Sequence, residues 1–169
     1  MKVLHIDHKE VVRLLPMDEC IDAMAEVLKT FSVGKAVMPL RSIVWHPDKR
    51  GGLGLMPAYL GSPELFGIKV VTVFPSNEGT EYESHQGAVM LFDAKYGAPM
   101  AVMDGGEITT IRTAAASGAA TRVLARKDAG DLAVIGSGTQ SRSHLQAMAE
   151  VRDLRRVRVW SRSAENARR

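Results

Sequence analysis

The spacing of apolar and polar positions predicts a helix near the start of the chain. Residues 17–34, MDECIDAMAEVLKTFSVG, carry apolar side chains at helical spacing. Asp18 is placed to cap the first turn, and Gly34 is placed to end the helix. These residues are therefore predicted to form an amphipathic surface helix.

Short β-like runs follow, and loops that contain Gly, Pro and Asp separate them. The runs are residues 41–46, 53–60, 66–75, 88–94 and 99–104. Their spacing predicts that much of this part is an antiparallel meander. The loop from Pro75 to Gly87 is longer than an ordinary connection, and loops of that length are more often functional than structural.

The pattern changes again at Glu107, where ITTIRTAAASGAATRVLAR predicts an Ala-rich helix that Asp104 and Glu107 are suited to cap. Its small side chains would let a neighbouring sheet or ligand come close. A strand at 131–135, a glycine turn, a helix at about 140–151 and a strand at 157–160 come next. The predicted fold class is α/β: a mostly antiparallel α+β part, then the start of a Rossmann-like doubly wound parallel sheet.

Composition narrows the class of protein. Apolar residues make up 46% and charged residues 24% of the 169 residues, values typical of globular proteins. No apolar run approaches the ~18 residues of a membrane span, and the first residues do not resemble a signal peptide. A single cysteine, Cys20, fits a reducing compartment. We therefore expect a cytoplasmic location and no membrane partner. The five histidines show no metal-ligand spacing with one another or with Cys20, so no metal site is predicted.

Charge is distributed unevenly. Residues 1–120 contain 11 Lys/Arg against 14 Asp/Glu, whereas residues 121–169 contain 11 against 5. The basic end lacks the interleaved aromatic residues of a single-strand binder and matches no DNA-reading motif, so we expect no nucleic-acid partner. A solvated helix end and loop explain these charges more simply.

The stretch VIGSGTQS has the features of a dinucleotide-binding turn. Gly136 permits a tight turn out of the strand, and Gly138 leaves room for a pyrophosphate against the backbone N–H groups at the helix start. Thr139 and Gln140 begin that helix, and Ser141 replaces the usual third glycine or alanine. A tight turn with no ligand is the alternative interpretation.

The end of the second predicted strand distinguishes the two nicotinamide cofactors. An acidic residue at this position would bind the ribose 2′-hydroxyl of NAD, but the sequence has Ser161, Arg162 and Ser163. An arginine can pair with a 2′-phosphate, and the serines can donate hydrogen bonds to it. The sequence thus favours NADP(H) over NAD(H), unless Arg162 is an ordinary solvated arginine.

Three cations are candidates for a substrate site. Lys69 lies inside the apolar run FGIKVVTVF, where an ammonium group needs a partner or a cleft, although it could also extend from an edge strand to solvent. Arg112 lies on the small-residue helix and Arg41 begins a strand. Two guanidinium groups at one cleft would suit an amino-acid carboxylate. A surface arginine at position 41, and an ion pair of Arg112 with Glu107 or Asp104, remain alternatives.

The stretches GIKVVTVFPSN, SHQGAVMLFDAKYGAPMAVMDGGEITTIRTAAASGAAT and AVIGSGTQSRSHLQA together resemble the ornithine cyclodeaminase/mu-crystallin family. The resemblance covers nearly the whole chain. It implies a substrate-binding and dimerisation domain over residues 1–125, including the linking helix, and an incomplete NAD(P)-binding Rossmann domain over 126–169. Because members of the family are longer, we expect this chain to be the N-terminal part of such a protein, inactive alone, and a homodimer.

The resemblance also implies residue roles. Arg41, Lys69 and Arg112 match positions that bind the substrate carboxylate, with Lys69 assisting proton transfer, and Met56 matches a substrate-lining segment. Ser84 stands where family members commonly have a threonine, and a role in cofactor binding is expected for it. The default expectation for His85 is a loop histidine.

The implied activity is NAD(P)-dependent conversion of L-ornithine to L-proline and ammonia, or action on a related amino acid. Two alternatives remain open. One is an NADPH-dependent ketimine or imine reductase or an alanine-dehydrogenase-like enzyme. The other is a non-catalytic binding protein like mu-crystallin, or an inactive fragment.

Overall fold

A computed structural model describes residues 2–77 and 79–168 of the chain, which form two compact units. One unit contains Met1–Leu14 and Leu28–Ile108, and the other contains Leu15–Val27 and Thr109–Arg169. Compactness does not by itself define a domain, so the boundary between residues 125 and 126 stays a prediction.

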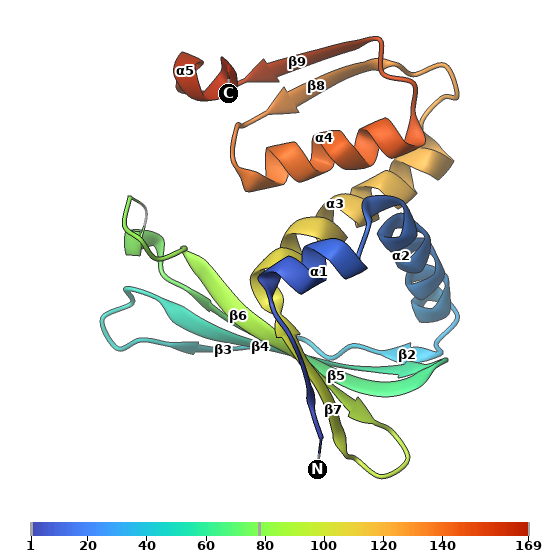
Figure 1. Cartoon of the computed structure of the whole chain (residues 1–169), viewed down its shortest axis with the longest axis vertical. Helices are drawn as coiled ribbons and strands as arrows, with labels where there is room; N and C mark the ends of the chain where they lie inside the picture. The colour runs from blue at the N-terminus through green and yellow to red at the C-terminus, as the bar shows by residue number, and fades with distance from the viewer. Residues whose placement is uncertain (1, 78, 169) are drawn as a thin grey trace. The chain divides into compact units, whose positions relative to one another are not determined.

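The first unit is built on a seven-stranded sheet with the order β1-β7-β6-β5-β4-β2, and β3 also pairs with β4 (Figure 1). The strands are β1 (Leu4–Ile6), β2 (Ala36–Val37), β3 (Ser42–Trp45), β4 (Gly52–Gly61), β5 (Glu64–Val73), β6 (His85–Asp93) and β7 (Pro99–Asp104). All pairs are antiparallel except β1 with β7. The predicted antiparallel meander is therefore confirmed.

Three short elements of this unit were not predicted: strands β1 and β2, and a short helix after β1. β1 pairs in parallel with β7, and helix α1 (His8–Leu14) follows it. A reciprocal capping box starts α1: the Asp7 N–H donates to Glu10 Oε2 at 3.0 Å, and the Glu10 N–H donates to Asp7 Oδ1 at 2.9 Å. Val11 is buried, and α1 contacts β7. The cap thus fixes a helix too short to be recognised by its periodicity.

The long loop is shorter than predicted. A 3-10 turn covers Pro75–Asn77, and β6 begins at His85, which pairs with Val73. The expectation that His85 lies in a loop was therefore wrong, because strand pairing extends three residues beyond the predicted run that starts at residue 88.

The second unit joins four helices or parts of helices to a parallel strand pair (Figure 1). Its elements are the first part of α2 (Met17–Ser32), most of α3 (Gly105–Leu124), β8 (Asp131–Ile135), α4 (Thr139–Val151), β9 (Arg156–Trp160) and α5 (Ala164–Arg168). β8 pairs with β9 in parallel from Asp131 opposite Arg156 to Ile135 opposite Trp160. This strand–helix–strand unit confirms the predicted start of a doubly wound sheet.

Small residues bring the helices of this unit together. A Cβ on Gly118 of α3 would lie 2.9 Å from Ile21 Cδ1 on α2 and 3.5 Å from Ala147 Cβ on α4. Ala114 and Ala115 are fully buried. Gly118 of α3 is therefore closely approached by two helices of this unit, and the expected approach of a sheet or a ligand to the Ala-rich helix stays a prediction.

Both predicted helix starts can be compared with the structure. Asp104 Oδ1 accepts the Glu107 N–H at 2.7 Å, which confirms the cap of α3. Asp18, in contrast, lies inside the first turn of α2, which already begins at Met17. The carbonyl of Pro16 accepts the Cys20 N–H at 3.0 Å, so the helix starts two residues earlier than a cap at Asp18 requires.

Candidate functional site

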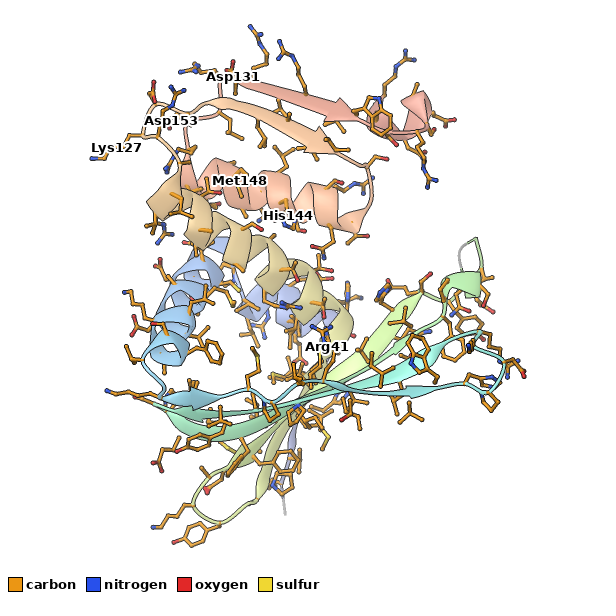
Figure 2. The ribbon with its side chains drawn as sticks, turned by 180° about the vertical axis from the view of Figure 1, so that it is seen from behind. Arg41, Lys127, Asp131, His144, Met148 and Asp153 are labelled. Carbon is orange, nitrogen blue, oxygen red and sulfur yellow. The ribbon has the colours of Figure 1, made fainter. Side chains whose placement is uncertain are left out.

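Three of the predicted substrate residues belong to neighbouring positions of the first unit's sheet. Met56 on β4 is directly opposite Lys69 on β5. Arg41 immediately precedes β3, whose first residue Ser42 pairs with Leu55, so continuing that register by one residue brings Arg41 beside Met56. Directly opposed residues project from the same face of a sheet. Figure 2 labels Arg41 on this sheet.

The burial of these residues differs. Lys69 and Met56 are half-buried, whereas Arg41 is exposed. On β6, Val89 is opposite Lys69 and is also half-buried, so the ammonium group is flanked across both strands by apolar side chains. A lysine in such a row keeps its charge only where its ammonium group reaches water or a polar partner. The apolar sequence around Lys69 predicted this surrounding.

Arg112 lies on α3 in the second unit, and its side chain is exposed. Its predicted approach to Arg41 therefore stays a prediction. The acidic residues considered as its partners have other contacts: Asp104 caps α3, and Glu107 Oε2 lies 3.5 Å from His8 Nδ1.

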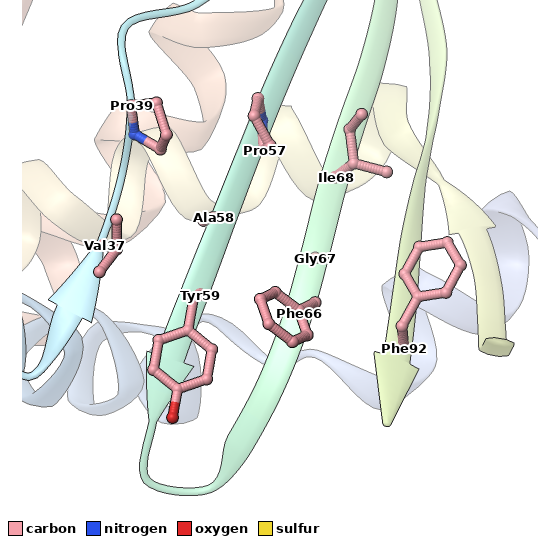
Figure 3. A pocket seen from close by; sticks show the side chains of 9 residues that line it. All are labelled: Val37, Pro39, Pro57, Ala58, Tyr59, Phe66, Gly67, Ile68 and Phe92. Carbon is pink, nitrogen blue, oxygen red and sulfur yellow. The ribbon is translucent and has the colours of Figure 1, made fainter. Parts of the chain in front are cut away.

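The opposite face of the same sheet carries an apolar pocket of about 430 Å³ (Figure 3). Phe66 is three residues from Lys69 on β5 and therefore points to the other side. The rings of Tyr59 and Phe66 are 5.1 Å apart between centroids, and Phe92 is opposite Phe66 on β6. The pocket thus lies on the face away from the predicted substrate residues.

The glycine turn after β8 has a conformation that requires glycine at its first position. Gly136 has φ +119°, which side chains rarely adopt, and a Cβ there would lie 3.2 Å from Ser141 Oγ. Ser141, at the third motif position, therefore still permits the strand and helix to come close, as predicted.

Gly138 is different, because its backbone does not require glycine. It is the N-cap of α4 with φ −86°, it forms no side-chain cap, and a Cβ there would meet no atom within 4 Å. Thr139 and Gln140 follow as the first, exposed residues of α4. The absence of a side chain at position 138 therefore leaves open space in front of the first N–H groups of a helix.

The three residues after β9 are placed beside this turn by a hydrogen bond that the sequence did not predict. Ser137, the residue between the two glycines, donates from Oγ to Ser161 Oγ at 2.8 Å. The Ser163 N–H also donates to Ser161 Oγ, at 3.4 Å, and Ser163 Oγ accepts the Asn166 N–H at 3.3 Å. Arg162 is exposed. The variable position of a Gly-x-Gly motif could have indicated a polar contact, but not its partner.

A second set of contacts holds the start of α4. The Gln140 carbonyl is 2.7 Å from His144 Nδ1, and a carbonyl only accepts, so Nδ1 carries the proton. In a neutral imidazole, Nε2 then accepts from Ser117 Oγ on α3, which is 3.1 Å away. Figure 2 labels His144 on α4. The sequence did not indicate this link between α3 and the first turn of α4.

Ser84 lies in the first unit, directly before β6, where its carbonyl accepts the Phe74 N–H at 2.9 Å. Its predicted role in cofactor binding stays a prediction, because the glycine turn belongs to the other unit. Within residues 2–77 and 79–168, no group of three or more His, Cys, Asp and Glu side chains is arranged for a metal ion. In the same residues, no helix is long and apolar enough to cross a membrane.

Comparison with known protein families gives a match over nearly the whole chain. The family model described as the ornithine cyclodeaminase/mu-crystallin family matches residues 2–169. The chain belongs to this family. Family membership confirms the resemblance inferred from the strand segments, the Ala-rich helix and the glycine turn together.

The similar proteins are named as different enzymes. The chain is 38% identical over 150 residues to the ketimine reductase mu-crystallin of Mus musculus, covering 87% of this chain and 48% of the relative. The Δ1-pyrroline-2-carboxylate reductase of Thermococcus litoralis, solved in complex with NADH and L-proline, is 37% identical with a TM-score of 0.93. An archaeal alanine dehydrogenase dimer with bound NAD is 33% identical, with the same TM-score.

The matched part is only a portion of each of these proteins. The chain is covered to 98% and 99% by the two structures but spans 51% of each of them, so it spans about half the length of the relatives it matches. Their shared fold confirms the predicted fold class of an α+β part followed by a Rossmann-like start.

Proposed function

We propose that this chain binds NAD(P)H and serves the reduction of a cyclic imine that carries a carboxylate, such as Δ1-pyrroline-2-carboxylate. Gly138 is the observation that carries the proposal. Its φ of −86° and its open surroundings give the fold no reason to require glycine, so the missing side chain serves a ligand. A pyrophosphate at the N-terminus of α4 explains why a side chain is absent there.

The residues of the turn fit this group. Gly136 forms the turn, Gly138 leaves the space, and the N–H groups of Thr139 and Gln140 would donate to the pyrophosphate. Bound NAD(P)H would supply a hydride to the imine carbon. The chain itself would hold the dinucleotide so that the nicotinamide is fixed against the substrate.

The substrate carboxylate would be bound by cations of the predicted set. Lys69 and Arg41 belong to one row of the sheet, and Arg112 remains a predicted third member. Reduction of an imine requires a proton at nitrogen as well as a hydride at carbon. An ammonium group held among Met56 and Val89 is suited to donate that proton or to stabilise the carboxylate, so Lys69 is proposed as the catalytic residue.

We propose that NADPH is preferred to NADH. The two solved relatives are described with NADH and with NAD, so the preference rests on this chain's own residues. Ser161 and Arg162 stand where a carboxylate would bind the ribose of NAD, and the exposed guanidinium can pair with a 2′-phosphate.

The other activities differ in their products. Ornithine cyclodeamination, the first activity that the resemblance implied, releases ammonia from ornithine without net change in cofactor. An alanine-dehydrogenase-like reaction consumes or forms ammonia together with cofactor turnover. The names of the reductase relatives favour the imine reductase over both. A binding role without turnover would follow the mu-crystallin resemblance.

We also propose that the chain forms a homodimer and that a second copy covers the apolar face of the sheet. The archaeal alanine dehydrogenase is described as a dimer. In this chain, Val37 is 57% exposed and Phe66 is 48% exposed around the pocket of Figure 3. An exposed apolar patch of this kind is typical of a protein contact.

Calorimetric titration of NADPH and NADH, with an Arg162→Asp variant, tests the cofactor site. Selective NADPH binding that the variant loses supports the proposal, and binding of neither cofactor contradicts it. Because the chain alone is expected to be inactive, substrate is then tested in a protein that contains this chain and spans the length of its relatives, by following NADPH oxidation with Δ1-pyrroline-2-carboxylate alongside ammonia release from ornithine with NAD(P)⁺. Ornithine turnover without imine reduction would favour the cyclodeaminase.

A further inference from the structure

The hydroxyl of Ser161 has both of its acceptor positions engaged. Ser137 Oγ donates to Ser161 Oγ at 2.8 Å, and the Ser163 N–H donates to the same oxygen at 3.4 Å. A serine hydroxyl has two lone pairs and one proton. Among the described residues, Ser161 Oγ is the donor in none of the hydrogen bonds found. With Ser137 as the donor of this hydroxyl pair, the proton of Ser161 is the part of the group that remains for a ligand.

Ser137 determines this arrangement. If Ser137 were alanine, the Ser161 hydroxyl could rotate and use its proton elsewhere, because one of the two donors that fix its oxygen would be gone. The link also crosses from the glycine turn after β8 to the end of β9, which is the position that distinguishes NAD from NADP in dinucleotide-binding folds. A single side chain thus connects the proposed pyrophosphate site with the proposed 2′-phosphate site.

We propose that Ser137 is a positioning residue for cofactor specificity: it fixes the Ser161 hydroxyl so that its proton points to an acceptor on the ribose 2′ position. This inference rests on the proposed NADPH preference. A 2′-phosphate offers several acceptor oxygens, whereas a 2′-hydroxyl can satisfy itself with solvent, so the effect favours the phosphorylated cofactor.

A double-mutant cycle separates this role from a structural one. NADPH and NADH are titrated by calorimetry into the wild-type chain and into Ser137→Ala, Ser161→Ala and the double variant. Ser137→Ala is expected to lower the ratio of NADPH to NADH affinity by about 3- to 10-fold. In the Ser161→Ala background the same change is expected to have almost no further effect, because its action passes through Ser161.

Ser137→Thr provides the conservative control, since it keeps a hydroxyl that can donate, and it is expected to restore most of the ratio. Thermal unfolding of each variant shows whether it is folded. An equal loss for both cofactors, or an undiminished effect of Ser137→Ala in the Ser161→Ala background, overturns the inference while leaving the proposed cofactor site intact. Equal wild-type affinity for both cofactors also overturns it. Binding of neither cofactor overturns the inference together with the proposed function.

Discussion

Met56 on β4 and Lys69 on β5 are direct cross-strand partners, so a thioether and an ammonium group share one face of the sheet. Val89 on β6 continues this row on the other side of Lys69. A charge in such a setting is costly unless it has a polar partner or a ligand. This relationship is the basis of the proposed role of Lys69.

Replacing Lys69 with methionine removes the charge and keeps the length of the side chain. In a protein that contains this chain and spans the length of its relatives, we expect kcat/KM for imine reduction to fall by about 10- to 100-fold, the effect of losing a charge-assisted hydrogen bond. Stopped-flow or steady-state measurement of NADPH oxidation checks this value. Lys95→Met, at an exposed turn, is the matched control and is expected to leave kcat/KM unchanged. An unchanged kcat/KM in the Lys69 variant would remove this residue from the site.

Gly136→Ala is expected to destabilise the fold by about 1–3 kcal/mol, because φ +119° strains any residue with a Cβ. The new methyl group would also lie 3.2 Å from Ser141 Oγ. Chemical denaturation of wild type and variant measures the difference in the free energy of unfolding. A variant as stable as wild type would show that this turn tolerates a side chain.

Arg152, the residue that ends α4, binds the carbonyl groups at the end of α3. Its Nη2 donates to the carbonyls of Thr121 at 2.8 Å and Ala125 at 2.7 Å, and its Nε donates to that of Arg126 at 3.0 Å. We expect Arg152→Ala to lower the free energy of unfolding by about 2–3 kcal/mol, because carbonyls at the helix end lose charged donors.

Arg152→Lys is expected to recover less than half of this loss, since one ammonium group cannot reproduce the fork of a guanidinium. Arg158→Ala, an exposed change in the same basic segment, is expected to stay within about 0.5 kcal/mol of wild type. If Arg152→Ala and Arg158→Ala had equal effects, the contacts of Arg152 would contribute nothing to stability. The basic end of the chain is thus partly structural, whereas sequence alone suggested only solvated charge.

Cys20 makes the stability of the second unit sensitive to alkaline pH. Burial raises the pKa of its thiol above the ordinary value of 9.0, and the Arg112 guanidinium partly opposes that rise. The unfolded thiol therefore ionises first, so the free energy of unfolding should fall as pH rises above about 9. Because other groups titrate there, the test is the difference between wild type and Cys20→Ala in denaturant unfolding at several pH values. A difference independent of pH would contradict the prediction.

Phe66→Glu should disrupt the proposed dimer, because a carboxylate on the apolar face cannot be buried against a second copy without large cost. Sedimentation equilibrium is expected to show a dimer for wild type and a monomer for the variant. Tyr96→Glu, at an exposed turn, is the control and should remain dimeric. A monomeric wild-type chain, or a dimeric Phe66→Glu variant, would mean that the pocket face is not the contact.

The sequence predicted the regular elements well where periodicity was long or strict. The strands Pro99–Asp104 and Asp131–Ile135 were predicted with the bounds that the structure has, and α4 within one residue at its start. The short elements β1, β2, α1 and α5 were missed. Two to seven residues are too few for a period to be recognised, and strand pairing or capping determines them.

The candidate site was predicted unevenly for a similar reason. The roles of the two glycines could be predicted because the residues of this motif are close together in the sequence. The contacts of Ser137 with Ser161, and of Ser117 with His144, join residues 24 and 27 positions apart. Such pairs depend on how elements pack, and a single sequence does not carry that information.

The most direct test of the account is calorimetric titration of NADPH into the wild-type chain and into Gly138→Ala. The variant should keep the wild-type unfolding midpoint, because its φ is ordinary and a Cβ there has open space. We expect wild type to bind NADPH and the variant to lose about tenfold or more in affinity, since the methyl group would occupy the place of the pyrophosphate. Equal affinity in both proteins would contradict it, because position 138 would then have no ligand to accommodate.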